Sequence, residues 1–257
     1  FLYWMAPMEA VKGRIQNGVE QFLGSRYQLE IETIKTYRFT GVSLRGISLE
    51  SQVEGKKVPV LNLDRLTARF GLFSILFGRP RLKFDARAGE ADISGSVQRQ
   101  EGAWQIHGSL DDLDVGTIPW VKSLTGLKLE SSIEGDWQVF YNPAEPLRTT
   151  GQLDIALDKL LLKASEVNLG EMGKFPLPDL QMADSKSVIE AQIDKGAIGL
   201  SNFLLQGKDI HLGLEGKIFL ANEPSNYRMN LKGKFKFSDK LWKILDPILP
   251  ETWLSEL

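Results

Sequence analysis

Residues 209–237 read DIHLGLEGKIFLANEPSNYRMNLKGKFKF, and this stretch decides the fold. From 210 to 220 the even positions are apolar or Gly, while the odd positions include His211, Glu215 and Lys217. After residues 222–225 the parity reverses, and polar side chains occupy the even positions up to 236. A sustained period of two indicates β-strands with one apolar and one wet face. At about 3.3 Å per residue each strand would span roughly 40 Å, about twice the usual strand length.

The apolar faces of these strands carry glycine. Gly216 and Gly233 each lie between two apolar neighbours of the same parity, and the same pattern recurs around Gly95, Gly108 and Gly135. Glycine inside a strand weakens it and usually marks a bend, a bulge or the close approach of another group. Two interpretations stay open: the glycines let a long sheet coil, or they clear space on the apolar face for a ligand.

Alternation of this kind recurs along most of the chain from Tyr27 onward. We therefore predict a mostly β fold: one elongated, strongly bent, mainly antiparallel sheet with short helices at both ends. The 257 residues can bury a large core, and all-β units of this size are often one domain.

Helices are expected at the two ends of this sheet. Residues 7–23 carry apolar side chains at helical spacing opposite polar ones, and Ser238 can cap a second helix over Asp239–Leu245. We divide the chain into three parts: a membrane-proximal segment with the amphipathic helix (1–24), a single elongated β domain (25–237), and a C-terminal capping helix with a tail (238–257).

The alternation breaks at three places. Between Leu63 and Leu66 the parity slips, which predicts a β-bulge. Residues 117–124 fit a short helix with Pro119 in its first turn. Residues 164–183 are apolar without periodicity, which is typical of a loop packed over the edge of a core and equally of a flap over a groove.

Composition and motifs argue against several classes of function. The net charge of −2 lacks the basic surplus of nucleic-acid-binding proteins, and the absence of Cys excludes disulfides and the usual zinc sites. The chain contains no phosphate-binding loop, dinucleotide fingerprint or nucleophile elbow, and His107 and His211 stand alone on polar parities. We expect a protein that is not an enzyme and that has no catalytic residue, no cofactor and no metal.

The first six residues read FLYWMA. Tyr3 and Trp4 are typical of the membrane interface, so this segment can be the end of a membrane-spanning helix that begins upstream. It can equally be an apolar terminus packed on the domain. No internal run approaches the roughly 20 apolar residues that span a bilayer.

Several features together resemble a known family. They are the TGVSLRGI segment at 40–47, the strand–apolar turn–strand unit at 61–95, Ile118-Pro119-Trp120 ahead of Gly126-Leu127, and the closing strands with their glycines. Over nearly the whole chain this pattern resembles the GspN protein of type II secretion systems, which is similar in turn to the AsmA-like envelope proteins. The resemblance implies an inner-membrane anchor, a domain in the periplasm and other secretion-system proteins as partners. For AsmA-like relatives it implies long, bent sheets whose concave apolar face carries lipid.

Two functions are therefore expected. The first is a non-enzymatic, membrane-anchored periplasmic component of type II secretion, with the inner membrane, lipid and secretion proteins as partners and without nucleic acid. The alternative is a lipid-binding or lipid-transfer module that uses an apolar groove on the concave face of the sheet. The residues expected to form that groove are Gly95, Gly108, Gly135, Leu212, Leu214, Gly216, Ile218, Met229, Leu231, Gly233 and Phe235.

Overall fold

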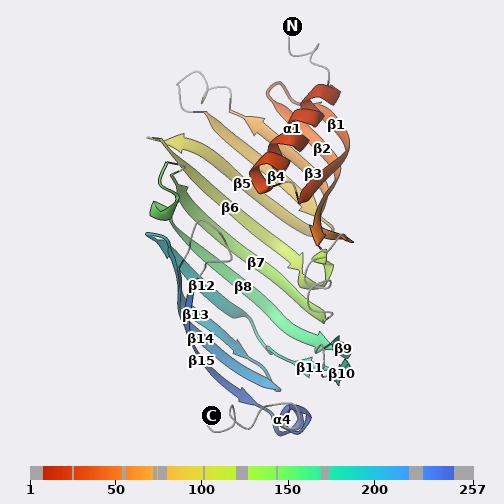
Figure 1. Cartoon of the computed structure of the whole chain (residues 1–257), viewed down its shortest axis with the longest axis vertical. Helices are drawn as coiled ribbons and strands as arrows, with labels where there is room; N and C mark the ends of the chain where they lie inside the picture. Colours follow the sequence, from red (N-terminus) through yellow and green to blue (C-terminus); the bar gives the residue numbers. More distant parts are fainter. Residues whose placement is uncertain are drawn as a thin grey trace.

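The computed structural model describes residues 8–24, 26–53, 56–71, 74, 80–100, 102–119, 127–142, 144–168, 174–219 and 228–245. These residues form one long antiparallel sheet with a helix at each end (Figure 1). This confirms the predicted mostly β, antiparallel architecture, whereas the strong bend stays a prediction. The principal strands are β1 Tyr27–Tyr37, β2 Gly41–Val53, β3 Lys56–Phe70, β4 Arg81–Ala88, β5 Ala91–Gln100, β6 Ala103–Asp114, β7 Lys128–Tyr141, β8 Thr150–Lys163, β12 Ser187–Asp194, β13 Ala197–Gln206, β14 Ile210–Phe219 and β15 Arg228–Phe237.

Strands that follow one another in the chain lie side by side in the sheet from β1 to β8 and again from β12 to β15. The segment between β8 and β12 holds three short strands: β9 Ser165–Asn168, β10 Lys174–Leu177 and β11 Leu180–Gln181. β9 pairs with β10 as a separate hairpin, while β11 extends the main sheet by pairing with the end of β8. Residues 164–183 are therefore partly regular, and 169–173 lie outside the described residues, so the choice between a loop and a flap stays open.

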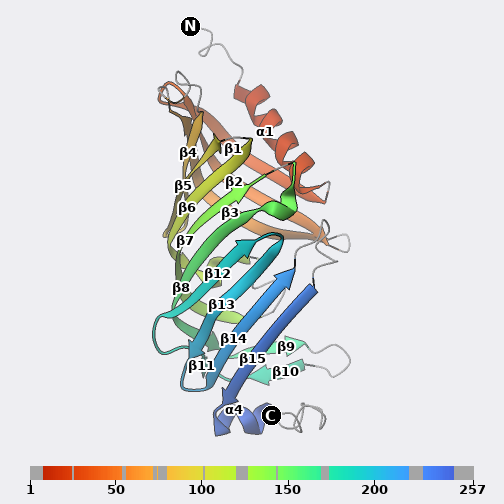
Figure 2. The ribbon, with the colours of Figure 1, turned by 90° about the vertical axis from the view of Figure 1, so that its left-hand side faces the viewer.

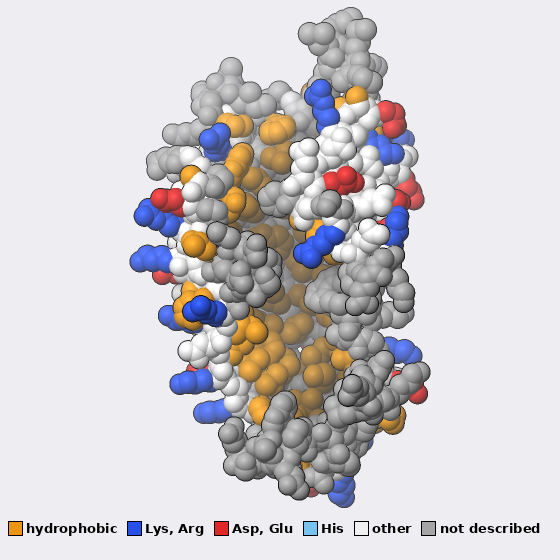
Figure 3. Space-filling model, viewed as in Figure 1, with side chains coloured by type: hydrophobic (Ala, Val, Ile, Leu, Met, Phe, Trp, Pro, Cys, Tyr) orange, Lys and Arg blue, Asp and Glu red, His pale blue; other side chains and the backbone are white. Residues whose placement is uncertain are grey.

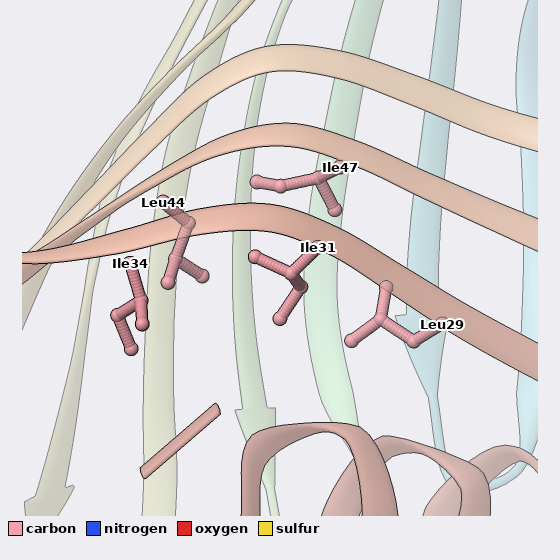
Figure 4. Close-up of a cluster of buried hydrophobic side chains, with 5 residues drawn as sticks. All are labelled: Leu29, Ile31, Ile34, Leu44 and Ile47. Carbon is pink, nitrogen blue, oxygen red and sulfur yellow. The ribbon is translucent and has the colours of Figure 1, made fainter. Parts of the chain in front are cut away.

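The predicted amphipathic helix is α1, Met8–Leu23, and it packs on the apolar side of β1 and β2. Figure 4 shows side chains from both strands pointing toward the helix. They form a buried cluster with apolar residues of α1, and the strand members of this cluster are Leu29, Ile31, Ile34, Leu44 and Ile47. Gln16 Nε2 also donates to the Leu29 carbonyl at 2.9 Å, so the helix satisfies one backbone acceptor of the first strand.

The second predicted helix is confirmed as α4, Asp239–Leu245, at the opposite end of the molecule (Figure 2). Ser238 Oγ accepts from the Leu241 N–H at 3.3 Å, as expected for an N-cap. Asp209 holds this cap in place, since its two carboxylate oxygens accept from Ser238 Oγ at 3.1 Å and from the Gln181 N–H at 2.9 Å. Leu241 is 2% exposed and packs with Leu162 and Leu180.

In β1, β2 and β3 the alternation of side chains between the two faces shifts by one residue, and it does so at positions that pair with one another. In each strand two residues three positions apart pack into the cluster under α1: Ile31 and Ile34, Leu44 and Ile47, Leu63 and Leu66. The pairing of the strands keeps its register through this switch, so the bulge predicted between Leu63 and Leu66 is wrong. The register shift of β3 lies nearer its start, between Pro59 and Leu61. Gly46, at the switch, has a φ of +57°, a conformation that glycine adopts without strain.

The short helix expected at 117–124 lies only partly within the described residues. Val115–Thr117 forms a single 3₁₀ turn, in which the Asp114 side chain accepts from the Gly116 N–H, and residues 120–126 lie outside the described residues. Most of the apolar turn in the strand–apolar turn–strand unit at 61–95 also lies outside them, since residues 72, 73 and 75–79 are not described.

Candidate apolar groove

Strand pairing aligns apolar residues from distant parts of the chain into rows that cross the sheet. Residues directly opposite each other in antiparallel strands share one face, so each row can be followed from strand to strand. The first row runs from β3 to β15 through Leu66, Ala86, Ile93, Leu110, Gly135, Ile155, Ile189, Phe203, Leu214 and Gly233.

Two further rows lie on the same face of the sheet. The second row consists of Ala68, Phe84, Gly95, Gly108, Trp137, Leu153, Ala191, Leu200, Gly216 and Leu231. The third row consists of Phe70, Leu82, Val97, Ile106, Val139, Gly151, Ile193, Ile198, Ile218 and Met229. No position in the three rows carries a charged or hydrogen-bonding side chain other than the Trp137 indole.

We call the face formed by these three rows the apolar groove. Figure 3 shows hydrophobic side chains gathered along a hollowed strip that runs down the long axis of the molecule. Basic side chains line one margin of this strip in the same view. The register therefore assembles one extended apolar surface from ten strands that each contribute three residues.

Among the residues that the structure describes, those that cover the groove lie at its two ends. Buried apolar residues gather under α1 at one end, and around Leu180, Ala183 and Leu241 at the other. Between these clusters, large row residues such as Ile93, Trp137 and Ile155 stay half-buried. No large side chain among the described residues is fully buried. Large contiguous apolar surfaces that are exposed to solvent usually mark binding sites.

Two of the glycines lie beneath aromatic rings from neighbouring strands. A Cβ atom at Gly95 would collide with the Phe84 ring, and one at Gly108 would collide with the Trp137 ring. The room left by these glycines is thus taken up by the two rings, an arrangement that also stabilises glycine in other sheets. A ligand above them would contact the rings rather than the glycine backbone.

The other three glycines are held by different contacts. Gly216 has a φ of +144°, which strains any other residue, and it faces the register shift between Leu200 and Phe203. A Cβ at Gly233 would lie 2.9 Å from Leu214 Cδ2, and one at Gly135 would lie 2.9 Å from a strand carbonyl. The room beside these glycines is therefore occupied by backbone or by a neighbouring leucine.

The structure brings together the residues that the sequence singles out for the groove. Nine of the eleven lie in the three rows, and the other two, Leu212 and Phe235, are paired with each other one step beyond the first row. Sequence reasoning missed all row members of β3, β4, β8, β12 and β13, and in β5 to β7 it found only the three glycines. The clearest omissions are Phe84, Trp137 and Ile155. Each has the parity of the glycines on its own strand or of the glycine it faces, and that signal could have found them.

The opposite face of the sheet is polar. It carries exposed ion pairs, of which Arg87 with Asp92 and Lys186 with Glu134 are examples. The hydrogen bond from Arg87 lowers the pKa of the Asp92 carboxyl, and the bond to Glu134 raises the pKa of Lys186. None of these groups lies in the groove, so ligand binding there is not expected to follow their titration.

His107 also lies on the polar face, where its Nε2 is 2.7 Å from Gln105 Nε2. Within the part of the chain that the structure describes, no three His, Asp or Glu side chains come together in a way that could hold a metal ion. What the described residues do offer is an extended surface for apolar contact.

Neither the described helices nor the comparisons with known proteins indicate a function. Among the described helices none is both long and apolar enough to span a bilayer. No protein-family model matches the chain, and neither a curated protein nor a solved structure matches it. The groove itself is therefore the best indication of what the chain does.

Proposed function

We propose that this chain is a non-enzymatic protein that binds the acyl chains of lipids in the apolar groove. The observation that carries this proposal is the unbroken apolar character of three adjacent rows whose central side chains stay half-buried. Covering such a surface is favourable by about 25 cal/mol per Å² of apolar area. An acyl chain can cover it without bringing any polar group that the rows could not satisfy.

The dimensions also suit this ligand. The rows cross ten strands, and strands lie about 4.8 Å apart, so the groove extends over roughly 40 Å. One leaflet contributes half of a bilayer's hydrocarbon core of about 30 Å, so an extended acyl chain occupies roughly 15 Å. More than one chain can therefore lie along the groove.

We propose further, on the resemblance to GspN and AsmA-like proteins, that the domain lies in the periplasm and is anchored to the inner membrane. The same resemblance supports a role beside other proteins of type II secretion. This role and lipid binding are compatible, since a secretion component can hold lipid.

Two neighbouring residues of β12 offer a matched test. Ile189 lies in the first row between Ile155 and Phe203, whereas Val188 points to the polar face and is 38% exposed. Ile189→Asp places a carboxylate in the path of the acyl chain, and Val188→Asp places the same charge on the other side of the same strand. We expect the first variant to lose binding of a fluorescent fatty acid by at least tenfold and the second to bind like the parent.

Thermal melts would establish that both variants are folded, and mass spectrometry of organic extracts would identify any lipid that copurifies with the parent. The proposal fails if the parent binds neither fatty acid nor phospholipid, or if folded Ile189→Asp binds as well as the parent.

A further inference from the structure

Basic side chains are concentrated at the β15 side of the sheet. β14 and β15 together contain five Lys or Arg residues and one carboxylate, Glu215. The whole chain has a net charge of −2, so this surplus is local. Four of the five belong to β15 itself, which contains no acidic residue: Arg228, Lys232, Lys234 and Lys236.

The same strand exposes apolar side chains on its other face. Met229 is 71% exposed, Phe235 45% and Leu231 38%, so the groove is most open to solvent along this strand. Apolar and basic side chains alternate along β15, and both sets reach solvent. Combined apolar and basic exposure on one element is typical of segments that lie in the interface of a membrane.

β15 is also the last strand of the sheet, and no other described strand pairs with its outer side. A second copy of this chain is a poor partner there. Pairing two antiparallel β15 strands with their apolar faces aligned would set Lys and Arg residues opposite one another, and like charges in such positions are destabilising. Lysines on an edge strand are a recognised means of preventing this pairing.

We propose that β15 docks on the surface of an anionic phospholipid bilayer. Lys232, Lys234 and Lys236 contact lipid phosphates, while Met229, Leu231 and Phe235 enter the boundary between headgroups and acyl chains. The unpaired backbone groups of the strand keep it at headgroup depth, since burying them in hydrocarbon is strongly unfavourable. This docking goes beyond the proposed function, since it requires no lipid to leave the bilayer. It does place the open side of the groove against the membrane.

The test is vesicle flotation of the full chain with neutral phosphatidylcholine vesicles and with vesicles that also contain phosphatidylglycerol. The parent should float with the anionic vesicles only and should be released as salt rises, because surface attraction is screened. Replacing Lys232, Lys234 and Lys236 by Gln should weaken partitioning by roughly 100-fold, at about fivefold per charge.

The control variant carries Gln in place of Arg69, Arg81 and Lys83. These three residues lie on the polar face and make no ion pair that the structure describes. Both variants lose three positive charges, so the change in net charge is the same. The control should float like the parent, because it keeps every basic residue of β15. Equal loss in both variants would show a general effect of charge and overturn the proposal.

A second measurement separates this proposal from lipid binding in the groove. The Lys variant should still bind soluble fluorescent fatty acid, and Ile189→Asp should still float with anionic vesicles. A parent that ignores anionic vesicles, or a folded Lys variant that floats like the parent, rules out docking through β15. Either result would favour an acidic protein segment as the occupant of this edge.

Discussion

At the scale of single residues, the groove depends on pairs formed by a glycine and the aromatic ring that covers it. Gly108 and Trp137 are direct partners across β6 and β7, and Gly95 and Phe84 are partners across β5 and β4. Each ring occupies the position that a Cβ on its glycine would take. Phe84 and Trp137 therefore fill the room beside these glycines in the apolar groove.

The pair of Gly108 and Trp137 gives a prediction. Gly108→Ala pushes a methyl group into the Trp137 ring, and such overpacking destabilises by about 1–3 kcal/mol. Gly213→Ala is the matched control, since a Cβ there would meet only Leu204 Cδ1 at 3.7 Å. Its effect should stay within about 0.5 kcal/mol. Urea unfolding followed by tryptophan fluorescence measures both.

A double-mutant cycle with Trp137→Leu completes this test. The cost of Gly108→Ala should fall by more than half in the Trp137→Leu background, because the ring that it displaces is gone. An unchanged cost would show that the backbone at Gly108, and not the ring, requires glycine.

The same residues show which parts of the groove can be predicted from the sequence. The groove members of β14 and β15 were predictable because their alternation runs without interruption over both strands. Phe84 and Trp137 were not identified, since a single strand does not reveal which residue of its neighbour lies opposite. That information is in the register, which depends on long-range pairing and on shifts such as the one between Leu110 and Leu113.

At the scale of elements, α1 and α4 each close one end of the apolar face. Both helices were predictable from local signals: apolar residues at helical spacing for α1, and Ser238 with its following turn for α4. Their docking sites were not, because Leu162 and Leu180 are brought beneath α4 only by the pairing of β11 with β8.

The docking of α4 gives the next prediction. Leu241→Ala truncates a side chain that is only 2% exposed and should destabilise the protein by about 2–5 kcal/mol. Lys243→Ala, on the exposed side of the same helix, should change stability by less than about 0.5 kcal/mol. Light scattering should also show self-association of Leu241→Ala, since Leu162 and Leu180 lose their cover. A variant that is monomeric and as stable as the parent would show that α4 does not act as a cap.

At the scale of the whole molecule, the described residues place no second layer over the middle of the sheet. Folded domains usually bury the apolar face of a sheet against helices or another sheet. Here the described chain provides that cover only at the two ends, so strands such as β5 to β8 are held by their ladders and by half-buried side chains. A bound lipid would supply the missing layer.

The difference between the two ends of the sheet, which described residues cover, and its middle leads to the last prediction. A ligand that binds only the folded state stabilises it by about 2.7 kcal/mol when its free concentration is 100 times Kd. For a chain of this size, 1 kcal/mol moves Tm by roughly 2–4 °C, so saturating fatty acid should raise Tm by about 5–10 °C. Ile189→Asp should show no such rise, while Val188→Asp should show all of it. Hydrogen exchange locates the effect: amides of β5 to β8 should gain protection on binding, and those of β1 under α1 should not. Equal protection along the whole sheet would mean that lipid does not take the place of a second layer over the open middle.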